Sequence, residues 1–138
     1  MAKAWLDSSI IHFAAGCIGY RWAVKVLRYV FENPHSVHVD ALTFTEVLER
    51  YPREPDSDVG MDIYTNLRRA MSSNQLAEIT LEDFKNSSKE YVGQINPRLS
   101  LRVALMKRNS CQDYLATFAT GIEHVSELKR VNFMDRIS

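Results

Sequence analysis

The hydrophobic pattern of the first third of the chain predicts helices. Ser8 or Ser9 can cap a helix whose apolar residues recur at helical spacing as far as Ile18. The stretch 20–32 repeats this spacing, and Asn33-Pro34 ends it because the residue before a proline avoids the α region. We expect one or two core helices here.

The next stretch alternates between strand and helix signals. Polar and apolar residues alternate over 36–40, which is typical of a short strand, and 43–46 resembles a capping box that opens a helix. Prolines and acidic residues over 52–58 predict a loop. A further helix is expected from Asp58 or Asp62 to about Ser73, with Ile63 and Leu67 on its inner face.

The second half of the chain is open to two interpretations. After a strand-like segment at 76–80, residues 80–95 have the spacing of a helix but also contain turn residues that suit a hairpin. Asn96-Pro97 breaks the chain, and the alternation over 99–105 predicts a strand. Ser110 with Asp113 can open a last helix, over about 110–131.

Composition indicates one globular domain. A chain of 138 residues with 46% hydrophobic residues can bury a core of its own, so we expect a single domain over 1–138. No apolar run reaches the roughly 18–20 residues of a membrane span, and the start lacks the pattern of a signal peptide. We therefore expect a cytoplasmic protein that does not enter a membrane. The fold class expected is α+β and predominantly helical.

Charge is balanced overall but unevenly distributed. The formal net charge is zero, whereas the stretch 60–110 holds eight basic and five acidic residues. This local excess of +3 lies on and around the predicted helix that carries Arg68 and Arg69.

The order of predicted elements over 22–98 resembles the winged-helix DNA-binding fold, flanked by N- and C-terminal helices. The resemblance is best at 61–71, which is similar to a recognition helix, followed by 74–79 as the strand that starts a wing. It implies a small DNA-binding transcriptional regulator of the helix-turn-helix class, bound to double-stranded DNA. The long acidic turn over 54–58 departs from that pattern.

The resemblance also implies which residues would contact DNA. Arginine can read guanine and asparagine can read adenine in the major groove, while lysines on a wing would contact phosphates. The residues expected at this interface are Thr65, Asn66, Arg68, Arg69, Ser73, Lys85 and Lys89. A homodimer through the terminal helices would match two half-sites.

Two other functions stay open. Zero net charge and the acidic loop favour a non-enzymatic adaptor or inhibitor that binds a protein partner. A third possibility is an enzyme that uses His38 and Asp40, which would share one face of a strand. No phosphate-binding, dinucleotide-binding, nucleophile-elbow or zinc-protease motif is present, so we expect no catalytic residues, metal or cofactor.

Overall fold

A parallel five-stranded sheet forms the centre of the protein. The structure, a computed structural model, describes residues 3–16, 21–50, 57–72, 74–90, 96–117 and 120–137. The strand order is β3-β2-β1-β4-β5, and every neighbouring pair is parallel. The strands are β1 (Ala4–Leu6), β2 (Val37–Asp40), β3 (Leu76–Ala77), β4 (Asp113–Ala116) and β5 (Lys129–Asn132).

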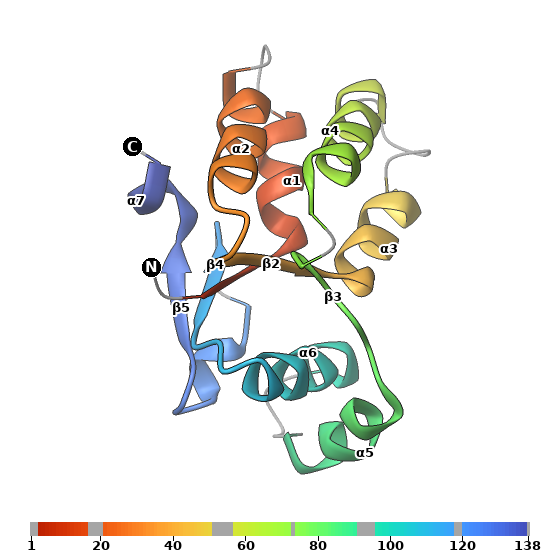
Figure 1. Ribbon diagram of the computed structural model, residues 1–138, viewed down its shortest axis with the longest axis vertical. Coiled ribbons are helices and arrows are strands. Elements are labelled where there is room, and N and C mark those ends of the chain that lie inside the picture. The colour runs from red at the N-terminus through yellow and green to blue at the C-terminus, as the bar shows by residue number, and fades with distance from the viewer. Residues whose placement is uncertain are drawn as a thin grey trace.

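Helices cover both faces of this sheet. Figure 1 shows α1 to α4 above the sheet and α5 with α6 below it. The helices are α1 (Ser8–Gly16), α2 (Arg21–Glu32), α3 (Ala41–Arg50), α4 (Ser57–Ala70), α5 (Leu81–Glu90), α6 (Pro97–Arg108) and α7 (Phe133–Ile137), with a short 3₁₀ helix, η1 (Ile122–His124). Short parallel strands joined through helices need this arrangement, because both faces of the sheet must be buried.

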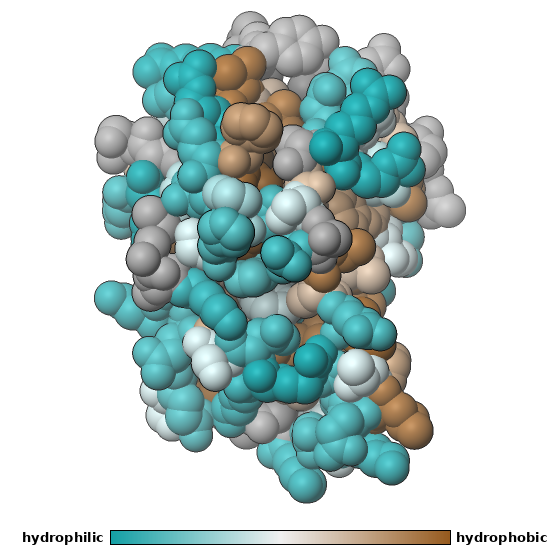
Figure 2. All heavy atoms as spheres, viewed as in Figure 1, coloured by the Kyte–Doolittle hydropathy of each residue, from teal (hydrophilic) through white to brown (hydrophobic). Residues whose placement is uncertain are grey.

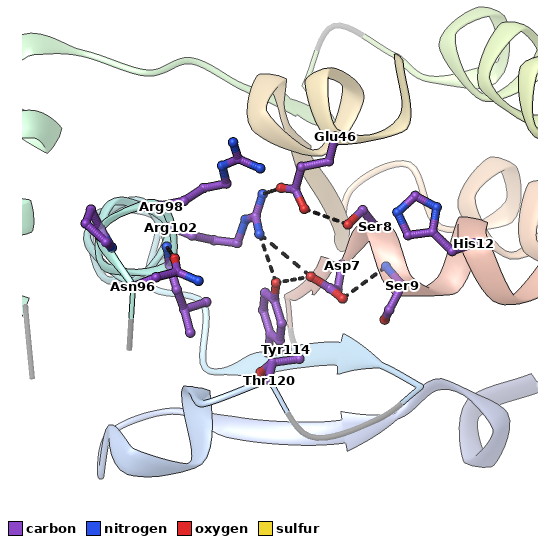
Figure 3. Close-up of a pocket in the computed structure, with 12 residues that line it drawn as sticks. Asp7, Ser8, Ser9, His12, Glu46, Asn96, Arg98, Arg102, Tyr114 and Thr120 are labelled. Carbon is purple, nitrogen blue, oxygen red and sulfur yellow. Dashed lines mark hydrogen bonds and ion pairs between the residues drawn. The ribbon is translucent and has the colours of Figure 1, made fainter. Parts of the chain in front are cut away.

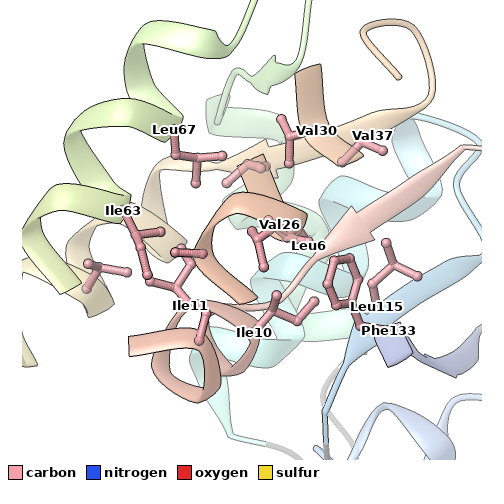
Figure 4. Close-up of a cluster of buried hydrophobic side chains, with 14 of the residues drawn as sticks. Leu6, Ile10, Ile11, Val26, Val30, Val37, Ile63, Leu67, Leu115 and Phe133 are labelled. Carbon is pink, nitrogen blue, oxygen red and sulfur yellow. The ribbon is translucent and has the colours of Figure 1, made fainter. Parts of the chain in front are cut away.

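The alternation of side chains along the strands divides the core into two clusters. Leu6 and Leu115 are register partners and pack with α1, α2 and α4, as Figure 4 shows. Trp5 and Tyr114 are also register partners, and they point to the opposite face, where α6 packs on them. All four side chains are fully buried.

Several local predictions are confirmed. The predicted helices near Ser8 and over 20–32 are α1 and α2, and the predicted strand over 36–40 is β2. Helix α4 corresponds to the helix predicted before Ser73, but it begins earlier, at Ser57. The open segment 80–95 contains helix α5 and no hairpin over 81–90; residues 91–95 and Ser73 lie outside the described ranges. Thr80 and Asp83 cap α5 reciprocally, as the spacing indicated.

The winged-helix prediction is wrong. A winged helix needs a hairpin after the recognition helix, whereas α4 is followed by a two-residue strand that pairs with β2 in the parallel sheet. Lys85 and Lys89, expected on a wing, lie on helix α5. The class is α/β with a five-stranded parallel sheet.

Two predicted elements have the wrong type. The stretch 99–105 is part of α6, where Asn96 is the N-cap and Pro97 occupies the first turn, a position that proline tolerates. Every side chain from Leu99 to Met106 is buried, so burial on all sides hides the helical period. The expected helix over 110–131 is instead β4, η1 and β5. Without it, the proposed dimer of terminal helices loses its basis.

The outer surface is mainly polar, with exceptions over two helices. Figure 2 shows apolar side chains on the surface over α2 and at the end of the molecule occupied by α5. Phe31 on α2 is 66% exposed, and Leu81 on α5 is 71% exposed. No helix in the described part of the chain has both the length and the apolar character needed to cross a membrane.

Shortening a buried side chain of this sheet should lower the stability of the protein. Leu115 is fully buried between the sheet and α1, so Leu115→Ala should lower the free energy of unfolding by about 2–5 kcal/mol. Leu48→Ala on α3 is the matched control, because Leu48 is 41% exposed. Urea unfolding of both variants measures the difference. Equal losses for the two would contradict the assignment of β4 to the core.

Candidate active site

Acidic side chains gather where the parallel strands end. Asp7 follows β1 directly and Asp40 is the last residue of β2, and each of them begins the next helix. Asp7 Oδ2 accepts a hydrogen bond from the Ser9 backbone N–H at 3.0 Å. Asp40 Oδ1 accepts one from the Thr43 backbone N–H, also at 3.0 Å. These are N-cap hydrogen bonds, and they hold both carboxylates at the same edge of the sheet.

The Arg102 side chain from α6 lies among these carboxylates. Its Nε donates to Asp40 Oδ2 at 2.8 Å, and its Nη2 donates to Glu46 Oε1 at 2.6 Å. Its Nη1 lies 3.7 Å from Asp7 Oδ1. The arginine side chain is only 3% exposed. A buried charge of this kind is tolerated only when it is paired and hydrogen-bonded, and here three acids meet that need.

Two aromatic side chains complete the cluster. The Tyr114 hydroxyl donates to Asp7 Oδ1 and accepts from Arg102 Nη1 at 3.1 Å. Trp5 Nε1 donates to Asp40 Oδ2 at 2.8 Å. Burial raises the pKa of the Tyr114 hydroxyl well above its usual value, so it stays protonated and acts as a donor.

The Asp40 carboxyl is held in its charged form. Burial alone would raise its pKa, but the Arg102 charge and the hydrogen bonds from Arg102, Trp5 and the Thr43 N–H outweigh that effect. The pKa of Asp40 therefore lies below its ordinary value of 3.8. Arg102, for its part, has a pKa well above its usual value despite burial, because of the nearby Tyr114, Asp40 and Glu46.

A pocket of about 600 Å³ opens over this cluster. Figure 3 shows Arg98 and His12 on either side of Glu46, Arg102 and Asp7. The pocket is lined by Asp7, Ser8, Ser9, His12, Glu46, Asn96, Pro97, Arg98, Leu99, Arg102, Tyr114 and Thr120. The Arg98 side chain is 48% exposed, which leaves this cation accessible to a ligand. The pocket therefore combines two carboxylates, an imidazole and an accessible guanidinium.

Glu46 has a different role from the one its spacing suggested. The sequence pattern made it the second half of a capping box with Thr43, but α3 begins at Ala41 with Asp40 as its cap. The Glu46 side chain therefore does not cap the helix, and it points into the pocket (Figure 3). Its Oε2 accepts from the Ser8 hydroxyl at 2.7 Å, which connects α3 to α1.

The residues predicted to bind DNA do not come together. Thr65, Asn66, Arg68 and Arg69 lie on α4, while Lys85 and Lys89 lie on α5, on the other side of the sheet (Figure 1). Ser73 lies outside the described residues. Asn66 donates to the backbone oxygen of Asp62 at 2.9 Å, and Arg68 lies over the Tyr64 ring at 5.7 Å. These side chains do not form one interface.

The alternative of an enzyme that uses His38 and Asp40 placed the two side chains on one strand face, and only this placement is found. The two side chains do share a face of β2, but Asp40 bonds to Arg102 and Trp5, and His38 stacks near Trp5 at 6.0 Å. Burial, followed by the charge of Lys3, lowers the pKa of His38. Asp7, Glu46 and Arg102 were missed. The available signals are an acid between a strand and a helix for Asp7 and a lone arginine within the run 99–106 for Arg102, whereas Glu46 inside α3 has none.

Comparison of the sequence identifies no relative, whereas comparison of the structure identifies proteins with a similar fold. No protein-family model matches the chain, and neither does any curated protein. The structure is similar to DNA-bound VapBC from Salmonella typhimurium, with a TM-score of 0.68, 8% identity and coverage of 96% of this chain and 99% of that one.

Two further structures are similar to the same extent. VapBC2 from Rickettsia felis, bound to a promoter fragment, matches with a TM-score of 0.66 and 8% identity over 94% of this chain and 97% of that one. PAE2754 from Pyrobaculum aerophilum matches with a TM-score of 0.62 and 8% identity over 99% and 94%. At this identity the likeness is one of fold, and the fold is that of the PIN domain.

This fold contradicts two functional predictions. A transcriptional regulator with a winged recognition helix is ruled out, because the chain has a PIN-like parallel sheet and its expected DNA contacts lie on separate faces. The prediction of a protein without enzymatic activity is contradicted as well, because the PIN domain is a nuclease-like fold. That prediction relied on missing motifs, and the acids at this site, at positions 7, 40 and 46, form no motif.

The buried ion pair should make stability depend on pH. Because the folded pKa of Asp40 is depressed, the stabilisation is present above about pH 3.8 and is lost as the pH falls through the folded pKa. Asp40→Asn should therefore cost about 3–5 kcal/mol of unfolding free energy near pH 7, and the gap to wild type should narrow below pH 3.8.

Urea unfolding between pH 7 and pH 3 measures this gap. Asp62→Asn on α4 is the control, because that carboxylate is exposed and should change stability little at either pH. A gap for Asp40→Asn that is constant with pH would show that the carboxylate does not act through its charge.

Proposed function

We propose that this protein is a ribonuclease that binds single-stranded RNA in the pocket over Asp7, Glu46 and Arg102 and cleaves its phosphodiester backbone. Proteins with the PIN-domain fold are typically Mg²⁺-dependent ribonucleases. The observation that carries the proposal is the convergence of Asp7 and Glu46, from β1 and α3, with His12 and Arg98 in one open pocket. In parallel α/β sheets, ligands bind at this carboxyl edge.

The residues present do not fit a divalent metal ion. Mg²⁺ and Mn²⁺ favour several carboxylate or carbonyl oxygens directed at one point. Here the oxygens of Asp7 and Glu46 are already engaged by Ser8, Ser9, Tyr114 and the Arg102 guanidinium. Across the described ranges, no group of three or more acidic, histidine or cysteine side chains can hold a metal as it stands, with Arg102 lying among Asp7, Asp40 and Glu46. No step of the proposed reaction passes through one.

The side chains of the pocket suffice for cleavage that uses the RNA's own 2′-hydroxyl. In that reaction the 2′-oxygen attacks phosphorus, the P–O5′ bond breaks, and the products are a 2′,3′-cyclic phosphate and a 5′-hydroxyl. The Glu46 carboxylate accepts one hydrogen bond on each oxygen and keeps further lone pairs, so it would accept the 2′-hydroxyl proton. His12 would give a proton to the departing O5′. Protons and electrons balance without water or a co-reactant.

Arg98 has the position of a phosphate-binding residue. Its side chain is half exposed at the pocket, and its nearest acidic partner is Glu49, with Nη2 and Oε2 separated by 4.0 Å and both side chains in solvent. Such a pair is weak, so a phosphate can replace the carboxylate at little cost. Guanidinium groups bind phosphate oxygens by two parallel hydrogen bonds.

The reaction should require the 2′-hydroxyl. Purified protein with a labelled single-stranded RNA should yield cyclic-phosphate ends, whereas the same sequence with 2′-O-methyl groups should bind but stay intact. His12→Asn should slow cleavage by about 10²–10⁴-fold, the usual contribution of a general acid. His124→Asn, at an exposed histidine of η1, is the matched control. Products with 3′-hydroxyl ends, or intact RNA throughout, would contradict this reaction.

Loss of the accessible cation should weaken RNA binding. Arg98→Gln should raise the dissociation constant for the 2′-O-methyl RNA about tenfold, since one charge-assisted contact of roughly 1.4 kcal/mol is lost. The control is Arg69→Gln on α4, an exposed arginine outside the pocket. Fluorescence anisotropy measures both. Equal effects of the two substitutions would mean that RNA binds elsewhere on the surface.

A further inference from the structure

The oxygens around Arg102 are arranged as ligands around a cation. They come from the ends of β1 and β2, from α3 and from β4, which are separate parts of the chain. The oxygen atoms that face the guanidinium belong to Asp7, Asp40, Thr43, Glu46 and Tyr114. Three of these residues are acids, so this shell holds a positive charge at its centre.

The guanidinium leaves no room for a second cation in this shell. The single Nε–H is directed at Asp40, the Nη1 group faces Tyr114 and Asp7, and the Nη2 group faces Asp40 and Glu46. All three nitrogens thus face acceptors of this shell: Nε and Nη2 donate to carboxylates, while Nη1 donates to Tyr114 and lies 3.7 Å from Asp7 Oδ1. A metal ion would need the same oxygens within about 2.0–2.6 Å, where the guanidinium now lies.

Arg102 is also fixed in place by the fold. It projects from α6 between flanking residues Leu101 and Val103, which are buried like the arginine itself. Withdrawing the side chain would leave Asp40, which is fully buried, without its ion-pair partner. An uncompensated buried charge is strongly unfavourable, so Arg102 is not a mobile group that yields to a metal.

We infer that the Arg102 guanidinium takes the place of the divalent cation, holding Asp7 and Glu46 in position so that the pocket functions without a metal. The inference deepens the proposed function and rests on it for the substrate, RNA. Arg102 lines the pocket but is a positioning residue, because its hydrogen bonds go to Asp40, Glu46 and Tyr114. Substrate phosphates are then bound by Arg98, the exposed cation nearby.

Direct metal binding tests this inference without reference to RNA. Titration of wild-type protein with Mn²⁺, followed by electron paramagnetic resonance, should show no site tighter than about 1 mM. Arg102→Gln removes the cation and leaves the acids, so this variant should gain a Mn²⁺ site, and Mn²⁺ should raise its melting temperature. A tight Mn²⁺ site in the wild type overturns the inference, whether or not the variant folds.

A matched control lies six residues further along the same helix. Arg108 also forms an ion pair with a buried acid, Asp83, at 2.7 Å, but no other carboxylate contacts it in the described structure. Arg108→Gln should therefore gain no Mn²⁺ site. If it gains one as tight as that of Arg102→Gln, the effect reflects a general loss of positive charge and the inference is wrong.

The dependence of RNA cleavage on metal separates this inference from the proposed function. Cleavage by the wild type should be equal in the presence of EDTA and of Mg²⁺. A strict requirement for Mg²⁺ would overturn the metal-free pocket and leave the ribonuclease assignment standing. Absence of cleavage under both conditions, with no Mn²⁺ bound by the wild type, would overturn the ribonuclease assignment and leave the role of Arg102 intact.

Discussion

The burial of one positive charge organises this protein. Arg102 is 3% exposed, and such a charge is stable inside a protein only if acids and hydrogen-bond acceptors surround it. Those acceptors come from Asp7, Asp40 and Glu46, so β1, β2 and α3 must be in register before α6 can pack. The ion cluster therefore connects α3 and α6, on opposite sides of the sheet, at the edge where the pocket lies.

The sequence predicts the elements whose signals are local. Helix α2 has one apolar face and ends near Asn33-Pro34, so it could be found from spacing alone. Helix α5 has a capping box, but its turn residues left a hairpin open as well. The sheet could not be found from spacing, because its strands are two to four residues long and too short for a reliable alternation. Strand β1 is only Ala4–Leu6, and its pairing with β4 joins residues more than a hundred positions apart. Tertiary pairing therefore decided the fold.

The site was missed for a related reason. Asp7, Glu46 and Arg102 carry no motif, since their spacing along the chain is set by helix lengths and not by the chemistry they share. Glu46 was assigned to a helix cap that Asp40 provides instead. Arg102 is the residue that sequence reasoning could have singled out, because a charged residue inside an apolar stretch needs a partner.

The position of β1 in the middle of the sheet sets the order in which the protein can fold. One neighbour, β2, follows within forty residues, but the other, β4, begins at Asp113. As the chain leaves the ribosome, β1 has an unpaired edge and Asp40 has no counter-charge until α6 and β4 have been synthesised. Contacts of such high sequence separation form late and slowly. Strand β1 is thus made long before the helix and the strand that complete its native environment.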